Sequence, residues 1–426
     1  MTAGPQFGLL SSPPQHLLVA ALNFATPTDP TVNRATVEKL RELLRRELAG
    51  DLDEITATTA KLDVWSETGE VGVADGWAQT NLTVDVGFSA SGYVALGYTS
   101  MGLQPQDLIE VPWDRFGPRI PLNPISGDLV LHIRADSLFA AEHVLRRVQH
   151  NLTGQLATIW TLSGTQRFAP PGTKLRDQGR ALNGFHDGLS NLNPHVEADR
   201  ALIFLDPAAV ASYPATPTAQ PAPGAAGYGG QPPTPTEPIF PATLRQPPTV
   251  EPAWTAGGSY MFVRGSVSDI GMWDSQPIGV QEATVGRFKS SGSFLDRVDT
   301  AANKDKQPLF ATEPTSVLVP PTSHVRRANP RLAASDPQRR VLRRGYPMFQ
   351  TGAETKRGLT LITFSRSLST QIEFIMAAWL TNPDFPHPNA GIDPLLTFEK
   401  EVLAGGYYFV PALSDGSEPT SWILPS

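Results

Sequence analysis

Cysteine is missing from this chain of 426 residues. Its absence excludes disulfide bonds, thiolate nucleophiles, iron–sulfur clusters, cysteinate-ligated haem and the covalent attachment of c-type haem. A composition without thiols fits the reducing cytoplasm, although many exported proteins also lack cysteine. It also leaves fewer groups for an oxidant to attack, since six Met and eight Trp are the main oxidisable side chains that remain.

Long apolar runs and an excess of positive charge are also missing. No run approaches the ~20 residues that a membrane helix needs, so we expect no membrane-spanning segment. The N-terminal stretch MTAGPQFGLLSSPPQH has neither a basic region followed by an apolar one nor a twin arginine. This predicts a cytoplasmic location, although a form trimmed of its export signal would read the same way. The net charge of −7 argues against nucleic acid as a partner.

The length and composition predict a soluble globular protein of two domains. The hydrophobic fraction of 40% and the charged fraction of 18% are ordinary for such proteins. Alternating and helical spacings of apolar residues mark the first half of the chain. They predict strands at His16–Phe24, Asn81–Phe88 and Asp128–Ile133, a helix at Asn33–Leu48, and a second helix capped by Asp136 or Ser137 that runs to Gln149.

A similar unit returns late in the chain. Leu359–Phe364 reads as a strand, and Ser367 or Ser369 then begins a helix. The expected apolar face of this helix carries Ile372, Ile375, Met376 and Trp379. The repeated order of strand and helix predicts two related α+β domains, each an antiparallel sheet covered by helices.

The segment Tyr213–Pro252 differs from its surroundings, since nearly a third of it is proline and most of the rest is small or polar. Such a composition cannot bury a core, so we expect an extended or disordered surface insertion. The runs on either side, Ala201–Leu205 and Tyr260–Val263, are strand-like. We therefore interpret the segment as a loop within the second domain; a Pro-rich partner-binding segment is the alternative.

The stretch Ser323–Met348 combines one of only eight histidines, His324, with a run of arginines. A solvated basic segment or a nucleic-acid patch is the ordinary interpretation of such a run. Asn-Pro and Asp-Pro break it into short pieces, and the whole chain is acidic, so neither interpretation fits well. One histidine followed by arginines of different reach suits a metal cofactor, with cations for its anionic groups.

Several motifs together carry a family resemblance. HVRRANPR and VLRRGYPM follow Gly184–Gly188, GFHDG, in the right order, and GGSYMFVRG, QEATVGRFK, GLTLITF and GGYYFVP match further. From about residue 125 onward, the chain resembles the dye-decolourising peroxidase family. Asn382–Leu396 is similar to the longer fungal and actinobacterial members. The resemblance implies two ferredoxin-like domains, at 1–165 and 166–426 with the Pro-rich insertion at 213–252, and haem b held mainly by the second.

The resemblance also implies roles for single residues. His324 would be the haem ligand, and Glu373 and Asp393 are both candidates to accept a hydrogen bond from its other ring nitrogen. Asp187 would be the distal acid–base, which implies a working range at low pH, with His186 as a variable neighbour.

Other residues would complete the haem site. Arg343, following Val341-Leu342, would stabilise charge during O–O cleavage, with adjacent Arg344 as the alternative. The expected haem-binding residues are Arg331, the weaker candidate Arg327, and the distal-wall residues Leu359 and Leu361.

The function implied is a haem peroxidase. It would use hydrogen peroxide to oxidise aromatic donors, such as dyes and phenols, by one-electron steps through an oxoferryl intermediate. Bulky donors would be oxidised through exposed Trp or Tyr residues, of which the sequence has eight each. A haem carrier or sensor is one alternative, and a non-haem interaction protein with a basic loop and a Pro-rich arm is another. The physiological donor, the oligomeric state and manganese oxidation stay open.

Overall fold

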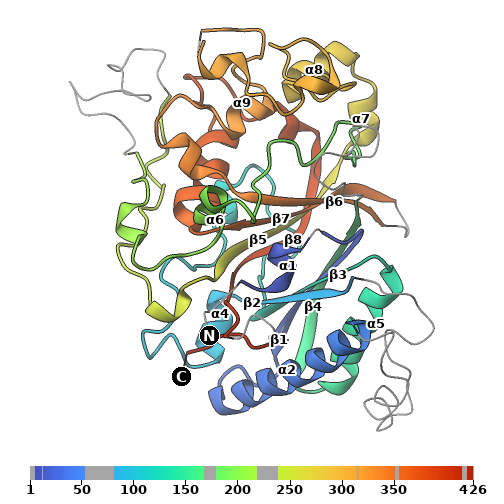
Figure 1. Ribbon diagram of the computed structural model, residues 1–426, viewed down its shortest axis with the longest axis vertical. Helices are drawn as coiled ribbons and strands as arrows, with labels where there is room; N and C mark the ends of the chain where they lie inside the picture. The colour runs from blue at the N-terminus through green and yellow to red at the C-terminus, as the bar shows by residue number, and fades with distance from the viewer. Residues whose placement is uncertain are drawn as a thin grey trace.

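The computed structural model of the protein describes residues 5–11, 13–52, 81–166, 179–217, 238–313, 315–350, 355–414 and 420–425. Its named strands form one eight-stranded sheet in the order β4-β1-β3-β2-β8-β5-β7-β6 (Figure 1). The strands are β1 His16–Phe24, β2 Thr83–Phe88, β3 Leu129–Ala135, β4 Leu156–Thr165, β5 Ser259–Ser268, β6 Leu342–Gln350, β7 Lys356–Ser365 and β8 Glu399–Val410.

The strand order shows the same arrangement twice. In each half of the chain the fourth strand lies beside the first, followed by the third and the second. This is the antiparallel order of a ferredoxin-like unit, which confirms the α+β class and the two ferredoxin-like units. The halves join where Phe88 of β2 pairs with Phe409 of β8. The exact domain bounds stay a prediction.

Period-2 alternation along the strands separates two cores. Along β1, Val19 packs in one core while Leu18 packs in the other. The first core also contains Ile362 of β7, so it lies between the two halves of the sheet. A hydrogen bond of 2.9 Å from Thr360 Oγ1 to the carbonyl of Ser163 links the halves there. The sheet halves therefore face each other, and their outer sides are left for the helices.

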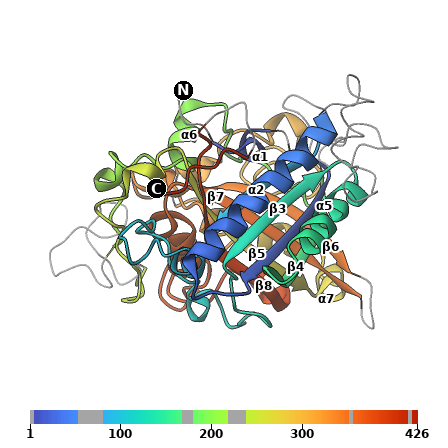
Figure 2. The same cartoon turned by 90° about the horizontal axis from the view of Figure 1, so that it is seen from below.

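The outer face of the first half is covered by α2 Pro30–Leu52 and α5 Leu138–Asn151, as Figure 2 shows from below. The helix expected at Asn33–Leu48 is confirmed and extends further at both ends. Of the two possible caps for α5, the structure has Ser137, whose hydroxyl accepts from the backbone N–H of Ala140. No helix within the described ranges is long and apolar enough to cross a membrane.

The remaining helices are short. They are α1 Phe7–Leu10, α4 Ala90–Ala95, η1 Trp113–Arg115, α6 Glu197–Ile203, η3 Val210–Ser212, η4 Ala253–Thr255, α7 Ile270–Asp274, α8 Ile278–Val285, η5 Ala301–Asn303, η6 Leu309–Ala311, α9 His324–Ala328, η7 Asp336–Arg339, the π-helices η8 Leu368–Ile372 and η9 Ile375–Leu380, and η10 Pro394–Phe398. The basic stretch is thus divided between α9, η7 and β6, as its prolines predict.

Two local predictions are wrong. The run Ala201–Leu205 is not a strand, because α6 continues to Ile203 after an acidic first turn that favours a helix. The helix after β7 does not have one apolar face, because every residue from 368 to 380 is buried. Phe240, from the end of the Pro-rich segment, covers it with a ring centroid 6.0 Å from that of Phe374.

The Pro-rich segment is therefore not wholly a surface loop. Its middle, residues 218–237, lies outside the described residues, whereas Phe240 is buried in the helix-covered core. The expectation that this composition buries no core is wrong at that point. A single aromatic residue among prolines anchors the returning chain.

A buried polar cluster lies between the sheet halves. His132 of β3 is fully buried, and its Nδ1 lies 3.0 Å from Oδ2 of Asp85. Arg134 reaches the same oxygen at 3.2 Å. Burial, together with the positive charge of Arg134, lowers the pKa of His132 to about 4. The folded protein therefore holds this imidazole neutral in mild acid, whereas the unfolded chain protonates it.

We predict that this histidine makes the fold sensitive to acid. In the unfolded chain, His132 binds a proton below a pH of about 6.5. Its contribution to the free energy of unfolding is therefore fully present above that pH. It is lost as the pH falls towards about 4, which removes roughly 3 kcal/mol from the free energy of unfolding. Urea unfolding at pH 7 and pH 4.5 measures this loss, which should be much smaller in His132→Gln. An equal loss in both proteins would contradict the assignment.

Candidate functional site

A cavity of about 250 Å³ brings most of the predicted site residues together. Asp187, His324 and Arg343 all line it, although they are far apart in the sequence. Arg331 and Leu359 line it as well. The remaining wall is largely apolar and includes Phe185, Val285, Val325, Ile375 and Leu395. Within the described residues, no group of three or more His, Cys, Asp or Glu side chains could hold a bare metal ion.

His324 is the first residue of α9 and is fixed by a carboxylate. Its Nδ1 lies 2.8 Å from Oδ2 of Asp393, which is fully buried at the start of η10. The other oxygen of Asp393 accepts from the backbone N–H of Leu395 at 2.8 Å. A neutral imidazole that donates from Nδ1 to this carboxylate keeps its lone pair on Nε2. His324 thus presents a ring nitrogen that can bind a metal.

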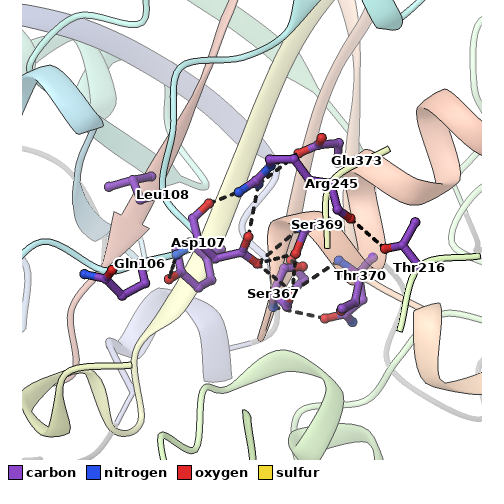
Figure 3. A network of polar contacts seen from close by, with 12 residues as sticks. Gln106, Asp107, Leu108, Thr216, Arg245, Ser367, Ser369, Thr370 and Glu373 are labelled. Carbon is purple, nitrogen blue, oxygen red and sulfur yellow. Dashed lines mark hydrogen bonds and ion pairs between the residues drawn. The ribbon is translucent and has the colours of Figure 1, made fainter. Parts of the chain in front are cut away.

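Glu373, the other candidate partner for His324, lies in a separate buried network (Figure 3). Its Oε2 accepts from Arg245 at 2.9 Å, and its Oε1 lies 3.4 Å from Arg115. Arg245 also pairs with Asp107 at 3.0 Å, and Asp107 Oδ2 accepts from the hydroxyl of Ser367 at 2.6 Å. The network ties the end of the Pro-rich segment to both halves of the chain. Between the two candidates, the geometry therefore selects Asp393.

Asp187 lies in a tight loop that contains two glycines. Gly184 and Gly188 have φ of +83° and +72°, a conformation that residues with a Cβ rarely adopt. The backbone N–H of Asp187 donates to the carbonyl of Gly179 at 3.2 Å, and its Oδ1 accepts from the N–H of Gly188 at 2.7 Å. Gln166 contacts the second oxygen, Oδ2, at 3.4 Å. The loop therefore holds the carboxylate at the cavity wall.

Alternation along β6 distinguishes Arg343 from Arg344. Arg343 faces the cavity and donates to the carbonyl of Leu189 at 2.9 Å. Arg344 points to the opposite side of the strand, where burial and the charge of Arg134 lower its pKa to about 10. The side chain of Asn191 accepts from the backbone N–H of Arg343 at 2.9 Å and donates to its carbonyl at 2.7 Å. This double hydrogen bond fixes the aspartate loop against β6.

Positive charge is concentrated at the cavity. Arg287, Arg331, Arg340 and Arg343 all line it. Burial, assisted by the charges of Arg343 and Arg331, lowers the pKa of Arg287 to about 9. Burial and the charge of Arg340 lower the pKa of Arg331 to about 10. Like charges held close together in an apolar wall create a field that favours an anionic ligand.

Besides Glu373 and Asp393, three sequence candidates do not line the cavity. Arg327 is fully buried, and its guanidinium donates to the carbonyls of Trp379, Gly391 and Asn382. It therefore holds the chain that leads to Asp393. Leu361 and Arg344 also lie outside the cavity wall. His186 does line it, and its Nε2 lies 3.3 Å from the carbonyl of Ser290.

Sequence reasoning missed three residues of the site. Arg287 belongs to the matching stretch QEATVGRFK, and Arg340 belongs to the basic run, so both were visible as parts of motifs. Which arginine of a run faces a cavity depends on the fold around it. Asn191 follows the Gly-rich loop in the sequence, but its contact with Arg343 spans 152 residues. No local pattern predicts such a contact.

Comparisons with known proteins match both halves of the chain to one family. Residues 20–166 match the model of the N-terminal part of the Dyp-type peroxidases, and residues 236–415 match the model of the C-terminal part. The chain is 29% identical over 171 residues to a deferrochelatase of Yersinia pestis, covering 39% of this chain and 36% of the relative. It is 27% identical over 220 residues to a deferrochelatase of Escherichia coli, covering 52% and 42%. It thus spans about two fifths of the length of these curated relatives.

Solved structures share the fold along almost the whole chain. An oxyferrous complex of DtpA from Streptomyces lividans matches with a TM-score of 0.70 and 21% identity, covering 99% of this chain and 95% of that one. A DyP-type peroxidase from Streptomyces coelicolor matches with a TM-score of 0.71 and 21% identity, with the same coverage. At this level of identity, the likeness establishes the fold.

Gly345 leaves the space that the Asp187 carboxylate occupies. A Cβ at Gly345 would lie 2.8 Å from Oδ2 of Asp187 and 3.4 Å from a methyl group of Leu359. We predict that Gly345→Ala displaces the carboxylate and lowers the free energy of unfolding by about 1–3 kcal/mol, as overpacking does. A crystal structure and urea unfolding measure the two effects. Gly279→Ala, where an added Cβ meets nothing within 4 Å, is the matched control. An unmoved Asp187 at wild-type stability would refute the prediction.

Proposed function

Because the chain belongs to the Dyp-type peroxidase family, we propose that it is a haem b peroxidase that uses hydrogen peroxide to oxidise aromatic donors. One observation carries the proposal. His324, whose Nδ1 is held by Asp393, lines the same cavity as Asp187 and Arg343. The first group suits a metal ligand, and the other two suit the cleavage of a peroxide bond.

The residues of the cavity fit haem. His324 would hold the haem iron through Nε2, with its ring oriented by the hydrogen bond to Asp393. The apolar wall suits a porphyrin face, and the arginine cluster suits carboxylate groups such as the two propionates of haem. Arg331 is the proposed propionate partner, and Arg287 and Arg340 add to the positive field. Arg327 has no part in this proposal, because carbonyl groups occupy its guanidinium.

When bound, haem would supply an iron centre that gives two electrons to peroxide and is then restored by two single electrons from the donor. The proposed task of Asp187 is to take a proton from the inner oxygen of hydrogen peroxide and return it to the outer oxygen, which leaves as water. Arg343 stabilises the negative charge that develops on the departing oxygen. Its contact with Leu189 and the Asn191 clamp hold it in place for this task.

Aromatic donors then deliver two single electrons for each peroxide. Leu359 narrows the cavity beside Asp187, which favours small molecules such as peroxide. Among the Trp and Tyr residues that the structure describes, Trp254 is the one that is not buried. Trp254 is therefore the one candidate among the described residues for electron transfer from bulky dyes at the surface, and it is only partly exposed. The cytoplasmic location rests on the sequence alone and stays a prediction.

A haem carrier or sensor would need His324 and the arginine cluster, but it would not need an acid–base. The convergence of Asp187 and Arg343 on one cavity therefore favours the peroxidase. A non-haem interaction protein would not need the His324–Asp393 pair.

We predict that His324→Ala purifies with little or no haem, because the variant lacks the imidazole that would hold the iron. The Soret absorbance relative to protein concentration measures the haem content. His387→Ala, which removes a histidine outside the cavity, should retain a wild-type spectrum. Full haem content in His324→Ala would show that another residue is the ligand.

We also predict that Asp187→Ala and Arg343→Leu each slow the reaction with hydrogen peroxide while haem content stays near normal. Loss of a positioned acid–base costs ~10²–10⁴ in rate. Loss of one electrostatic donor costs ~10²–10³. Stopped-flow spectroscopy with peroxide as the varied reactant measures the step. Arg344→Leu, on the other face of β6, should react at close to the wild-type rate. If Asp187→Ala and Arg343→Leu both react at wild-type speed, the distal assignment is wrong.

A further inference from the structure

Two phenylalanine rings pack behind the arginine cluster of the cavity. Phe294 is almost fully buried and lines the cavity wall, whereas Phe310 is fully buried and lies outside the wall. The two ring centroids lie 5.9 Å apart with an angle of 86° between the planes, which is an edge-to-face contact. Asp296, two residues after Phe294, accepts from the backbone N–H of Phe310 at 3.0 Å. The two rings are therefore held together as one packed pair.

Both rings contact the guanidinium of Arg331, the proposed partner of a haem propionate. The Cζ atom of Arg331 lies 5.8 Å from the ring centroid of Phe294 and 5.4 Å from that of Phe310. Both distances are within the ~6 Å range of cation–π attraction. Among the described residues, this guanidinium makes one hydrogen bond, from Nη1 to the carbonyl of Asn329 at 2.7 Å, and no ion pair. The rings thus accompany this cation where a carboxylate is more usual.

Arg331 occupies an unfavourable position. Its φ is +59°, in the left-handed region that residues with a Cβ rarely adopt. Burial, together with the charge of Arg340, lowers the pKa of Arg331 to about 10. The negative faces of aromatic rings oppose this effect, because they stabilise a cation without using its hydrogen-bond donors. The donors that remain can bind a carboxylate.

We propose that Phe294 and Phe310 are positioning residues, which hold the charged guanidinium of Arg331 at the cavity wall so that it pairs with a haem propionate. This inference rests on the proposed function. Phe294 also contacts Arg287, whose Cζ lies 3.7 Å from its ring centroid. Phe310 contacts Arg326 as well, but Arg326 lies outside the wall. Arg331 is therefore the cavity arginine that Phe310 contacts, and any effect of Phe310 on a bound anion is indirect.

Transfer of haem from the loaded protein to an excess of apomyoglobin measures how tightly the site holds its cofactor. Phe310→Leu keeps an apolar side chain but removes the ring face, and it should lose haem ~3–30-fold faster than the wild type. Haem dimethyl ester has the same porphyrin, but its propionates carry no charge. The wild type and Phe310→Leu should release this ester at rates within ~2-fold of each other, because the ester offers Arg331 no anion.

A double-mutant cycle separates the contact with Arg331 from a general packing defect. Arg331→Gln should itself lose haem faster, and adding Phe310→Leu to it should change the rate by less than ~2-fold. Phe116→Leu is the matched control. Phe116 is buried outside the cavity wall and makes an edge-to-face contact with Phe262, and no guanidinium of the described residues lies over its ring. This variant should retain haem as the wild type does.

Three results would overturn the inference. Phe310→Leu could lose haem at the wild-type rate, could release the ester as much faster as it releases haem, or could keep its full effect in the Arg331→Gln background. If Phe310→Leu fails to fold, Phe294→Leu is compared with haem and with the ester, and an equal effect on both overturns the inference. A wild-type protein that binds no haem would overturn the proposed function and this inference with it.

Discussion

The alternation of side chains along β6 is the constraint on which the rest of the structure depends. Arg343 and Gly345 lie on the cavity side of β6. Arg343 contacts the loop that carries Asp187, and Gly345 leaves room for the Asp187 carboxylate. Arg344 and Tyr346 face the core between the sheet halves, where the hydroxyl of Tyr346 donates to the carbonyl of Pro14. Because a strand has a period of two, a shift of one residue would exchange these faces and destroy both sites. The double hydrogen bond from Asn191 to the backbone of Arg343 fixes that register where the cavity needs it.

Much of the fold was predictable because each strand that faces a core on both sides is one continuous apolar run. Short polar segments separate these runs. Strand β1 coincides with its predicted range, and the Ser137 cap was one of two candidates. Predictions failed where a short apolar run had no periodicity of its own, as at α6, or where the chain is buried on all sides, as in η8 and η9. In those places tertiary packing, not local spacing, decides the structure.

The candidate site was predictable in its motifs and not in its pairings. His324 and Asp187 each lie in a recognisable stretch, whereas the choice between Glu373 and Asp393 depends on packing. Asp393 is 69 residues from His324, and Glu373 is taken by Arg245 from a segment that composition alone marks as a loop. Both oxygens of Glu373 contact arginines, Oε2 with Arg245 and Oε1 with Arg115, whereas His324 contacts Asp393, and this could be seen only in three dimensions.

Charge links the stability of the fold to its proposed function. The arginines of the cavity repel one another in an apolar wall, which costs folding free energy that a bound dianion would offset. Binding of an anionic cofactor and folding are therefore coupled. The same protein contains His132, whose burial favours the fold at neutral pH and weakens it in acid. An aspartate-centred reaction would run best in acid, so catalysis and the inter-sheet core would place opposite demands on pH. Ligand binding at the arginine cluster can offset the stability that the fold loses in acid, because the ligand binds only the folded chain.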